Sequence, residues 1–137
     1  MKEIINTLHS GRYSCVIKSA GEVYTFSRPG VADLYDLVKN KPGFLDEALI
    51  ADKVVGKAAA ALMIIGKVQG LHADIISAPA LSLLQDAGVE TTFTKVVPII
   101  RNRTNTDSCP LEKICCDELS AEAIFPLIEN FINSLNK

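Results

Sequence analysis

A cysteine followed by a proline, Cys109-Pro110, stands at the expected start of a short helix over residues 110–117, with Glu112 in its first turn. The N-terminus of a helix stabilises a thiolate, so Cys109 could act as a nucleophile or a redox-active thiol. Glu112 or Asp52 would then transfer the proton. Against this, no histidine lies nearby in sequence to act as base, and the carboxylate of Glu112 opposes the thiolate charge. The alternative is that Cys109 is a small packed or capping residue.

A second group of charged residues comprises Asp52, Lys53 and Lys57, with Gly56 between the lysines. If the segment is helical, Lys53 and Lys57 lie four residues apart on one face, where they could hold a phosphate or a carboxylate. The alternative is a solvated rim of an otherwise buried helix, with Asp52 neutralising one lysine. Gly56-Lys57 does not belong to a phosphate-binding Walker A loop, because that motif requires a glycine at position 51 and a serine or threonine at position 58, and both are alanine.

A polar loop over residues 101–107 contains the third candidate, Arg101. Binding residues concentrate on loops that rigid elements support, so this loop is the expected source of ligand specificity. The alternative is an ordinary solvated connection.

The histidines and cysteines do not form a recognisable metal motif. Cys109 and Cys116 are seven residues apart and lack the paired Cys-x-x-Cys spacing of zinc sites. Cys15 alternates with apolar residues in a predicted strand and fits the core. His9 is expected to end a helix and His72 to lie in a loop or at an edge. We therefore predict no metal site and no cofactor.

The totals indicate one domain over residues 1–137, in which 48% of residues are hydrophobic and 22% charged. A net charge of -2 without a basic run argues against nucleic-acid binding. The N-terminus lacks the apolar core of a signal peptide, and residues 54–65, the most apolar stretch, are too short to cross a bilayer. We expect a cytoplasmic protein that is not bound to a membrane and whose thiols are reduced.

Apolar periodicity and turn residues predict alternating helices and strands. Residues 46–65, with four consecutive alanines, are expected to form a central buried helix. Pro98 should either end the last strand or mark it as an edge strand, and Pro126 should bend the last helix, which Ser120 caps. The predicted helices cover residues 2–9, 31–39, 46–65, 79–87, 110–117 and 120–135, and the predicted strands residues 14–18, 22–26, 74–78 and 89–100. This order predicts an α/β fold, a three-layer α/β/α sandwich with a mixed sheet that begins in a hairpin.

The element order, with Ala51 to Ala60 on an alanine-rich helix and Cys109 to Lys113 opening a later one, resembles the cytidine deaminase-like fold. More closely, the chain resembles a small prokaryotic family of unknown function within that fold group. The resemblance implies the deaminase architecture, but a zinc deaminase needs His-x-Glu and Pro-Cys-x-x-Cys at two helix starts. Here the first position has Asp52, Lys53 and Lys57 instead, and in the second Cys109 precedes the proline. Deaminase chemistry is therefore not expected.

Three functions remain. The first is a zinc-free domain that binds a small anionic or nucleotide-like ligand through Asp52, Lys53, Lys57 and Arg101. The second is a cysteine-dependent enzyme using Cys109, so the sequence leaves open whether the chain is an enzyme. The third is an assembly module, a homo-oligomer whose exposed sheet edge pairs with itself.

Overall fold

The structure is a computed structural model that describes residues 1–28, 31–98, 118 and 120–135. Its centre is a five-stranded sheet in the order β2-β1-β3-β4-β5. β1 runs antiparallel to both of its neighbours, whereas β3, β4 and β5 run parallel to one another. The sheet is therefore mixed, as the sequence predicts. The strands are β1 (Cys15–Ser19), β2 (Glu22–Phe26), β3 (Leu49–Val55), β4 (Gly70–Ser77) and β5 (Glu90–Val97).

The predicted hairpin is confirmed as the pair β1 and β2. Its turn places both Ala20 and Gly21 at positive φ, 52° and 82°. A two-residue turn of this kind matches the twist of the strands it joins, and glycine adopts positive φ without strain. β1 is buried in the sheet, and β2 forms one edge with mostly exposed side chains.

The prediction of one central helix over residues 46–65 is wrong. Residues Leu49–Val55 form β3, Gly56 ends it, and α3 (Lys57–Gly66) begins only afterwards. A strand inside a parallel sheet is buried on both faces, so it shows a run of apolar residues without alternation. The sequence of β3 therefore has the same appearance as the buried helix that follows it, and the alanines of α3 favour helix for the whole run.

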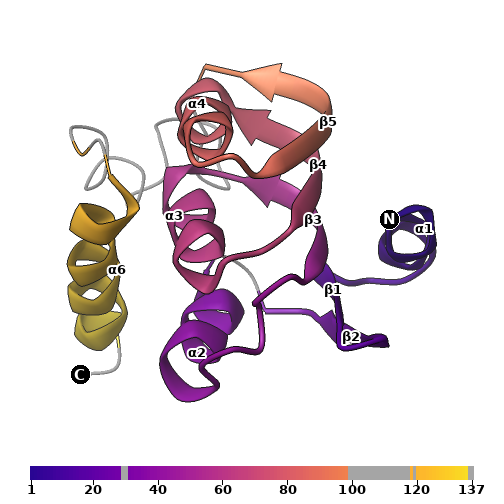
Figure 1. Cartoon of the computed structure of the whole chain (residues 1–137), viewed down its shortest axis with the longest axis horizontal. Helices are drawn as coiled ribbons and strands as arrows, with labels where there is room; N and C mark the ends of the chain where they lie inside the picture. Colours follow the sequence, from indigo (N-terminus) through magenta and orange to yellow (C-terminus); the bar gives the residue numbers. More distant parts are fainter. Residues whose placement is uncertain (29–30, 99–117, 119, 136–137) are drawn as a thin grey trace.

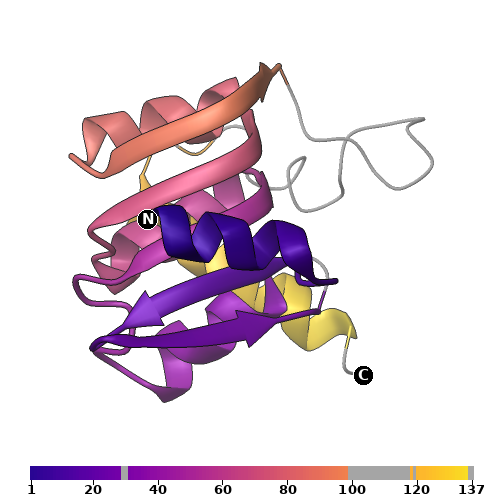
Figure 2. The ribbon, with the colours of Figure 1, turned by 90° about the vertical axis from the view of Figure 1, so that its right-hand side faces the viewer.

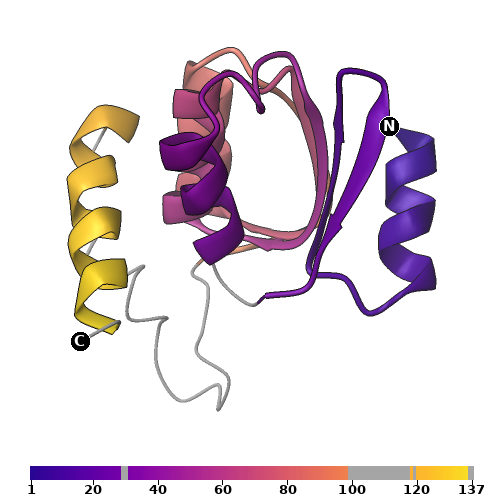
Figure 3. The same ribbon diagram turned by 90° about the horizontal axis from the view of Figure 1, so that it is seen from below.

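Helices lie on both faces of the sheet, which confirms the sandwich. Figure 1 shows α1 on one face and α2, α3 and α4 side by side on the other. α6 forms a further layer, packed on α3 and α2 and separated by them from the sheet (Figure 3). α3 thus lies between the sheet and α6, which explains why it is apolar on nearly every face. The helices are α1 (Lys2–Ser10), α2 (Ala32–Asn40), α3, α4 (Ala78–Asp86) and α6 (Ala121–Leu135).

Most of the remaining predictions hold within one or two residues. β4 begins four residues earlier than predicted, at Gly70. β5 ends before Pro98 and is the last of the described strands of the sheet, so both consequences expected of the proline occur in the described part of the chain. The Ser120 hydroxyl accepts a hydrogen bond from the Ala123 N–H at 3.2 Å, which confirms the predicted cap of α6. The helix predicted over residues 110–117 lies outside the described residues.

α1 covers only part of its face of the sheet. It packs on β1 and β3 through a small cluster containing Ile4, Leu8, Val16 and Ala51. Figure 2 shows β4 and β5 beyond α1 with no described helix in front of them. None of the described helices combines the length and the apolar character needed to cross a membrane.

Candidate functional site

Three helices begin at the same edge of the sheet. β2, β3 and β4 point in one direction, because β1 is antiparallel to β2 and β3 while β4 is parallel to β3. Each of these strands is followed by a helix, α2, α3 and α4 respectively. In open α/β sheets, ligands bind beyond the carboxyl ends of the strands, where helix N-termini gather. We call this side of the molecule the carboxyl edge.

The predicted ligand-binding residues that the structure describes lie between the middle of β3 and the carboxyl edge, an arrangement that differs from the sequence prediction. Asp52 and Lys53 are on β3, and Lys57 is the first residue of α3. Lys53 and Lys57 therefore do not share a helical face. That expectation is wrong because it assumed that β3 is helical. Arg101, Cys109 and Glu112 lie outside the described residues, so their roles stay predictions.

Asp52 is a buried carboxyl group, only 8% exposed, in register with Cys15 of β1 and Ala73 of β4. Its Oδ1 accepts a hydrogen bond from the Val54 N–H at 3.3 Å. Pairing between β3 and β4 passes over Lys53 and resumes at Val54. The Asp52 carboxyl group thus accepts a hydrogen bond from the backbone next to Lys53, the residue that has no partner in the pairing of β3 with β4.

The environment of Asp52 makes it able to exchange a proton near neutral pH. Burial raises its pKa from 3.8 to about 7, and the charge of Asp74 adds to this, whereas hydrogen bonds from the N–H groups of Val54 and Lys53 act in the opposite direction. A carboxyl group of this kind can donate a hydrogen bond in one form and accept a proton in the other.

Lys57 is a buried cation at the start of α3, 7% exposed. The N-cap of this helix is Gly56, which has no side chain to accept a hydrogen bond from the first N–H groups. A helix N-terminus carries a partial positive charge, to which Lys57 adds its own. The start of α3 is therefore suited to a negatively charged group.

At the start of α2, a carboxylate and an arginine meet. Arg28 donates from Nε to Oδ1 of Asp33 at 2.6 Å and from Nη2 to Asp36 at 2.5 Å. The other oxygen of Asp33, Oδ2, is buried and has no hydrogen-bond partner among the described residues. Burial, followed by the charges of Asp52 and Asp33, raises the pKa of the Cys15 thiol. Cys15 is therefore protonated, which fits the packing role predicted for it.

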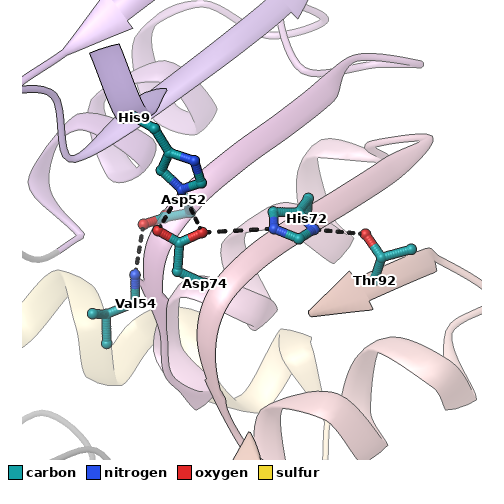
Figure 4. A network of polar contacts seen from close by, with 6 residues as sticks. All are labelled: His9, Asp52, Val54, His72, Asp74 and Thr92. Carbon is teal, nitrogen blue, oxygen red and sulfur yellow. Dashed lines mark hydrogen bonds and ion pairs between the residues drawn. The ribbon is translucent and has the colours of Figure 1, made fainter. Parts of the chain in front are cut away.

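A second polar cluster lies on the face that α1 partly covers, and the sequence interpretation missed it (Figure 4). His9 Nε2 is 2.8 Å from Oδ1 of Asp74, and His72 Nε2 is 3.6 Å from the same atom. The other ring nitrogen of His72, Nδ1, is 2.9 Å from the Thr92 hydroxyl. The available signal was His72-x-Asp74, because residues two apart in a strand share a face.

Among the residues that the structure describes, no set of donors fits a zinc deaminase centre. Its two histidines are His9 and His72, on α1 and β4, and neither is at the start of α2, α3 or α4. Cys15, in the middle of the sheet, is buried. Within the described ranges, no three or more His, Cys, Asp or Glu side chains are arranged to hold a metal ion.

A pocket of about 310 Å³ lies at the opposite edge of the molecule, between the C-terminal ends of α2 and α3. Its lining includes Leu37, Leu45, Lys41 and Lys67. None of the predicted site residues that the structure describes contributes to it. The carbonyl groups at helix C-termini disfavour anions, whereas the helix N-termini at the carboxyl edge favour them.

Comparison with known proteins gives a family and a similar solved structure from that family. The family model described as a domain of unknown function, DUF1893, matches residues 3–132. The crystal structure of a DUF1893 family protein from Thermotoga maritima superposes with a TM-score of 0.86 at 25% identity, covering 94% of this chain and 87% of that one. Acinetobacter baumannii RibD gives a TM-score of 0.44 at 15% identity, over 68% of this chain and 33% of its own, which supports no conclusion. No curated protein matches.

Proposed function

This chain belongs to the DUF1893 family, and we propose that it is a small-molecule-binding domain with an anionic or nucleotide-like ligand at the carboxyl edge of its sheet. The observation that carries the proposal is the burial of two ionisable side chains, Asp52 in the middle of β3 and Lys57 at the start of α3. Buried ionisable side chains gather at functional sites.

The two residues have different roles in this proposal. Lys57 and the N–H groups that begin α3 bind the negatively charged part of the ligand. Asp52, with its pKa of about 7, bonds to a polar part of the ligand and can serve as donor or acceptor. A ligand with an anionic group and a polar ring or sugar, as in a nucleotide, matches both roles. Arg101, which the sequence predicts to lie in a loop, would add specificity.

We extend the proposal to the fold group, the cytidine deaminase-like fold. Its support is the β1–β2 hairpin beside three parallel strands, with α3 and α4 joining them. The proposal contains no zinc-dependent deamination, because the donor residues do not fit. Release of ammonia from cytidine or adenosine by the purified chain would contradict this part.

Thermal unfolding with added probes tests the binding proposal. We would titrate inorganic phosphate, ribose 5-phosphate and adenosine monophosphate into the wild-type chain and into Lys57→Met and Lys2→Met variants. Lys2 is an exposed lysine on α1 and serves as the matched control. At least one probe should raise the Tm of the wild type and of Lys2→Met, and have a much smaller effect on Lys57→Met.

Far-UV circular dichroism shows whether each variant is folded before the titration. The proposal fails if no probe stabilises the wild type, or if Lys57→Met responds as the wild type does. The Asp52→Asn variant gives a second measurement: for a given probe, binding should depend more steeply on pH around 7 in the wild type than in the variant, whose remaining pH dependence comes from the second ionisation of the probe's own phosphate.

A further inference from the structure

The outer edge of β5 is unpaired along its length within the described part of the chain. β5 bonds to β4 on one side and is the last strand of the sheet. Its sequence, Glu-Thr-Thr-Phe-Thr-Lys-Val-Val, is rich in residues that favour strands. A row of free N–H and C=O groups on a regular edge strand is a template for another strand.

β5 has little of the protection that exposed edges usually carry. Lys95 is its one basic residue, and proline occurs only after its end, at Pro98. The large side chains of Phe93 and Val96 are 41% and 39% exposed. An exposed edge strand of eight residues with an aromatic side chain at its middle is suited to pairing with another strand.

The other edge strand, β2, is less suited to that role. β2 has five residues, and its Tyr24 is already engaged. The Tyr24 ring packs edge-on against Phe44 at 5.0 Å between centroids, and its hydroxyl donates to Glu22 at 3.2 Å. The contrast between the two edges selects β5.

We propose that β5 pairs antiparallel with β5 of a second copy of this chain across a two-fold axis, with Phe93 opposite Phe93 of the second copy. Two five-stranded sheets would then join into one continuous sheet. The net charge of -2 per chain is small enough to leave self-association unopposed.

Charge and register both support this arrangement. Glu90 and Lys95 lie toward opposite ends of β5, so an antiparallel pair places the acidic end of one strand beside the basic end of the other. A parallel pair would put like charges opposite each other. A two-fold axis perpendicular to the sheet requires one residue to face its own copy. Phe93 in that position pairs residues 90–96 without involving Pro98, and it stacks two aromatic side chains.

Light scattering after size-exclusion chromatography of the full chain tests the proposal over a wide concentration series. The wild type should be a dimer that dissociates on dilution. Phe93→Lys should shift the chain to monomer, because it places two cations on the axis. Val23→Lys is the matched control, since Val23 is 39% exposed on β2, and it should remain dimeric.

A charge-exchange experiment tests whether residue 93 faces its own copy across the two-fold axis. Its readout is the recovery of a dimer. Phe93→Lys and Phe93→Glu should each be monomeric, and an equimolar mixture should form the dimer again, which also shows that both variants are folded. A wild type that stays monomeric at every concentration overturns the proposal. So does a dimer that Val23→Lys breaks and Phe93→Lys preserves, or a monomer that binds an added strand-forming peptide at β5.

Discussion

His9 of α1 and Asp74 of β4 are 65 residues apart in sequence, yet His9 Nε2 lies 2.8 Å from one carboxylate oxygen of Asp74 and 2.9 Å from the other. The contact connects the N-terminal helix to β4, an inner strand of the sheet. α1 is also held by a small apolar cluster and by an ion pair between Glu3 and Lys18 of β1, 3.7 Å apart. The position of α1 therefore depends partly on a polar contact that is accessible to water.

His9→Ala should weaken the docking of α1 only modestly. The side chains of His9 and Asp74 are 51% and 27% exposed, and such pairs contribute at most about 1 kcal/mol. Chemical denaturation of His9→Ala, Asp74→Ala and the double variant measures the coupling between them. Coupling below about 0.2 kcal/mol, within error of zero, would show that the contact does not hold α1.

Asp52→Asn should change how the stability of the fold depends on pH. The pKa of Asp52 is about 7 in the folded chain against 3.8 in the unfolded chain, so the folded chain binds more protons in this interval. Its free energy of unfolding therefore falls as pH rises from about 4 to 7, by up to roughly 4 kcal/mol at 1.36 kcal/mol per pH unit.

The Asp52→Asn variant, whose amide oxygen can still accept from Val54, should lack this component. Urea denaturation of both proteins at several pH values measures the difference between them. Asp86→Asn, at an exposed position on α4, is the control and should follow the wild type. If the wild-type and Asp52→Asn curves remain parallel from pH 4 to 8, the raised pKa is contradicted.

Glu129→Gln should loosen α6 from the rest of the domain. Oε2 of Glu129 accepts hydrogen bonds from the Tyr35 hydroxyl and from Lys39 Nζ, both at 2.7 Å, and so connects α6 to α2. We expect Glu129→Gln to have a lower Tm than the wild type. Amide exchange should be accelerated more in α6 than in α3. Glu122→Gln, in the exposed first turn of α6, should leave exchange in the later turns unchanged. Equal exchange rates in Glu129→Gln and the wild type would show that the hydrogen bonds of Glu129 do not hold α6 in place.

These hydrogen bonds to Glu129 also have a pH dependence. Lys39 and then Tyr35 hold the pKa of Glu129 below its usual value of 4.5. Since a lowered pKa means that the ionised form is stabilised in the folded chain, the contribution is present above pH 4.5 and is lost as pH falls through the lowered pKa. The difference in Tm between wild type and Glu129→Gln should therefore shrink in acid.

Gly66→Ala should destabilise the chain although alanine favours helices. A Cβ atom at Gly66 would lie 2.7 Å from Cβ and Cδ1 of Leu45, a side chain in the core. Overpacking of this kind costs about 1–3 kcal/mol, against a gain of about 1 kcal/mol in helix propensity. Chemical denaturation should show that the penalty disappears in a Leu45→Ala background. A penalty of the same size in both backgrounds would place the cause elsewhere.

Local signals in the sequence predicted most of the fold. The β1–β2 hairpin follows from a turn with glycine between two short strand-forming runs, and the start of α6 follows from Ser120. Both depend on residues close together in the chain, so they are readable without tertiary information. The alternation of strands and helices in the second half likewise indicated parallel strands with helices on both faces.

The tertiary structure alone decided three things. Residues of β3 are apolar because both faces of the strand are covered, so their pattern could not separate strand from helix. The pKa of Asp52 depends on that burial and on Asp74 of the neighbouring strand. The contacts of Asp74 with His9 and His72 join residues brought together only by sheet register and by the docking of α1. The sequence by itself determined which residues could do chemistry and the class of fold, whereas folding determined which of them meet, because proximity across strands and layers leaves no local pattern in the chain.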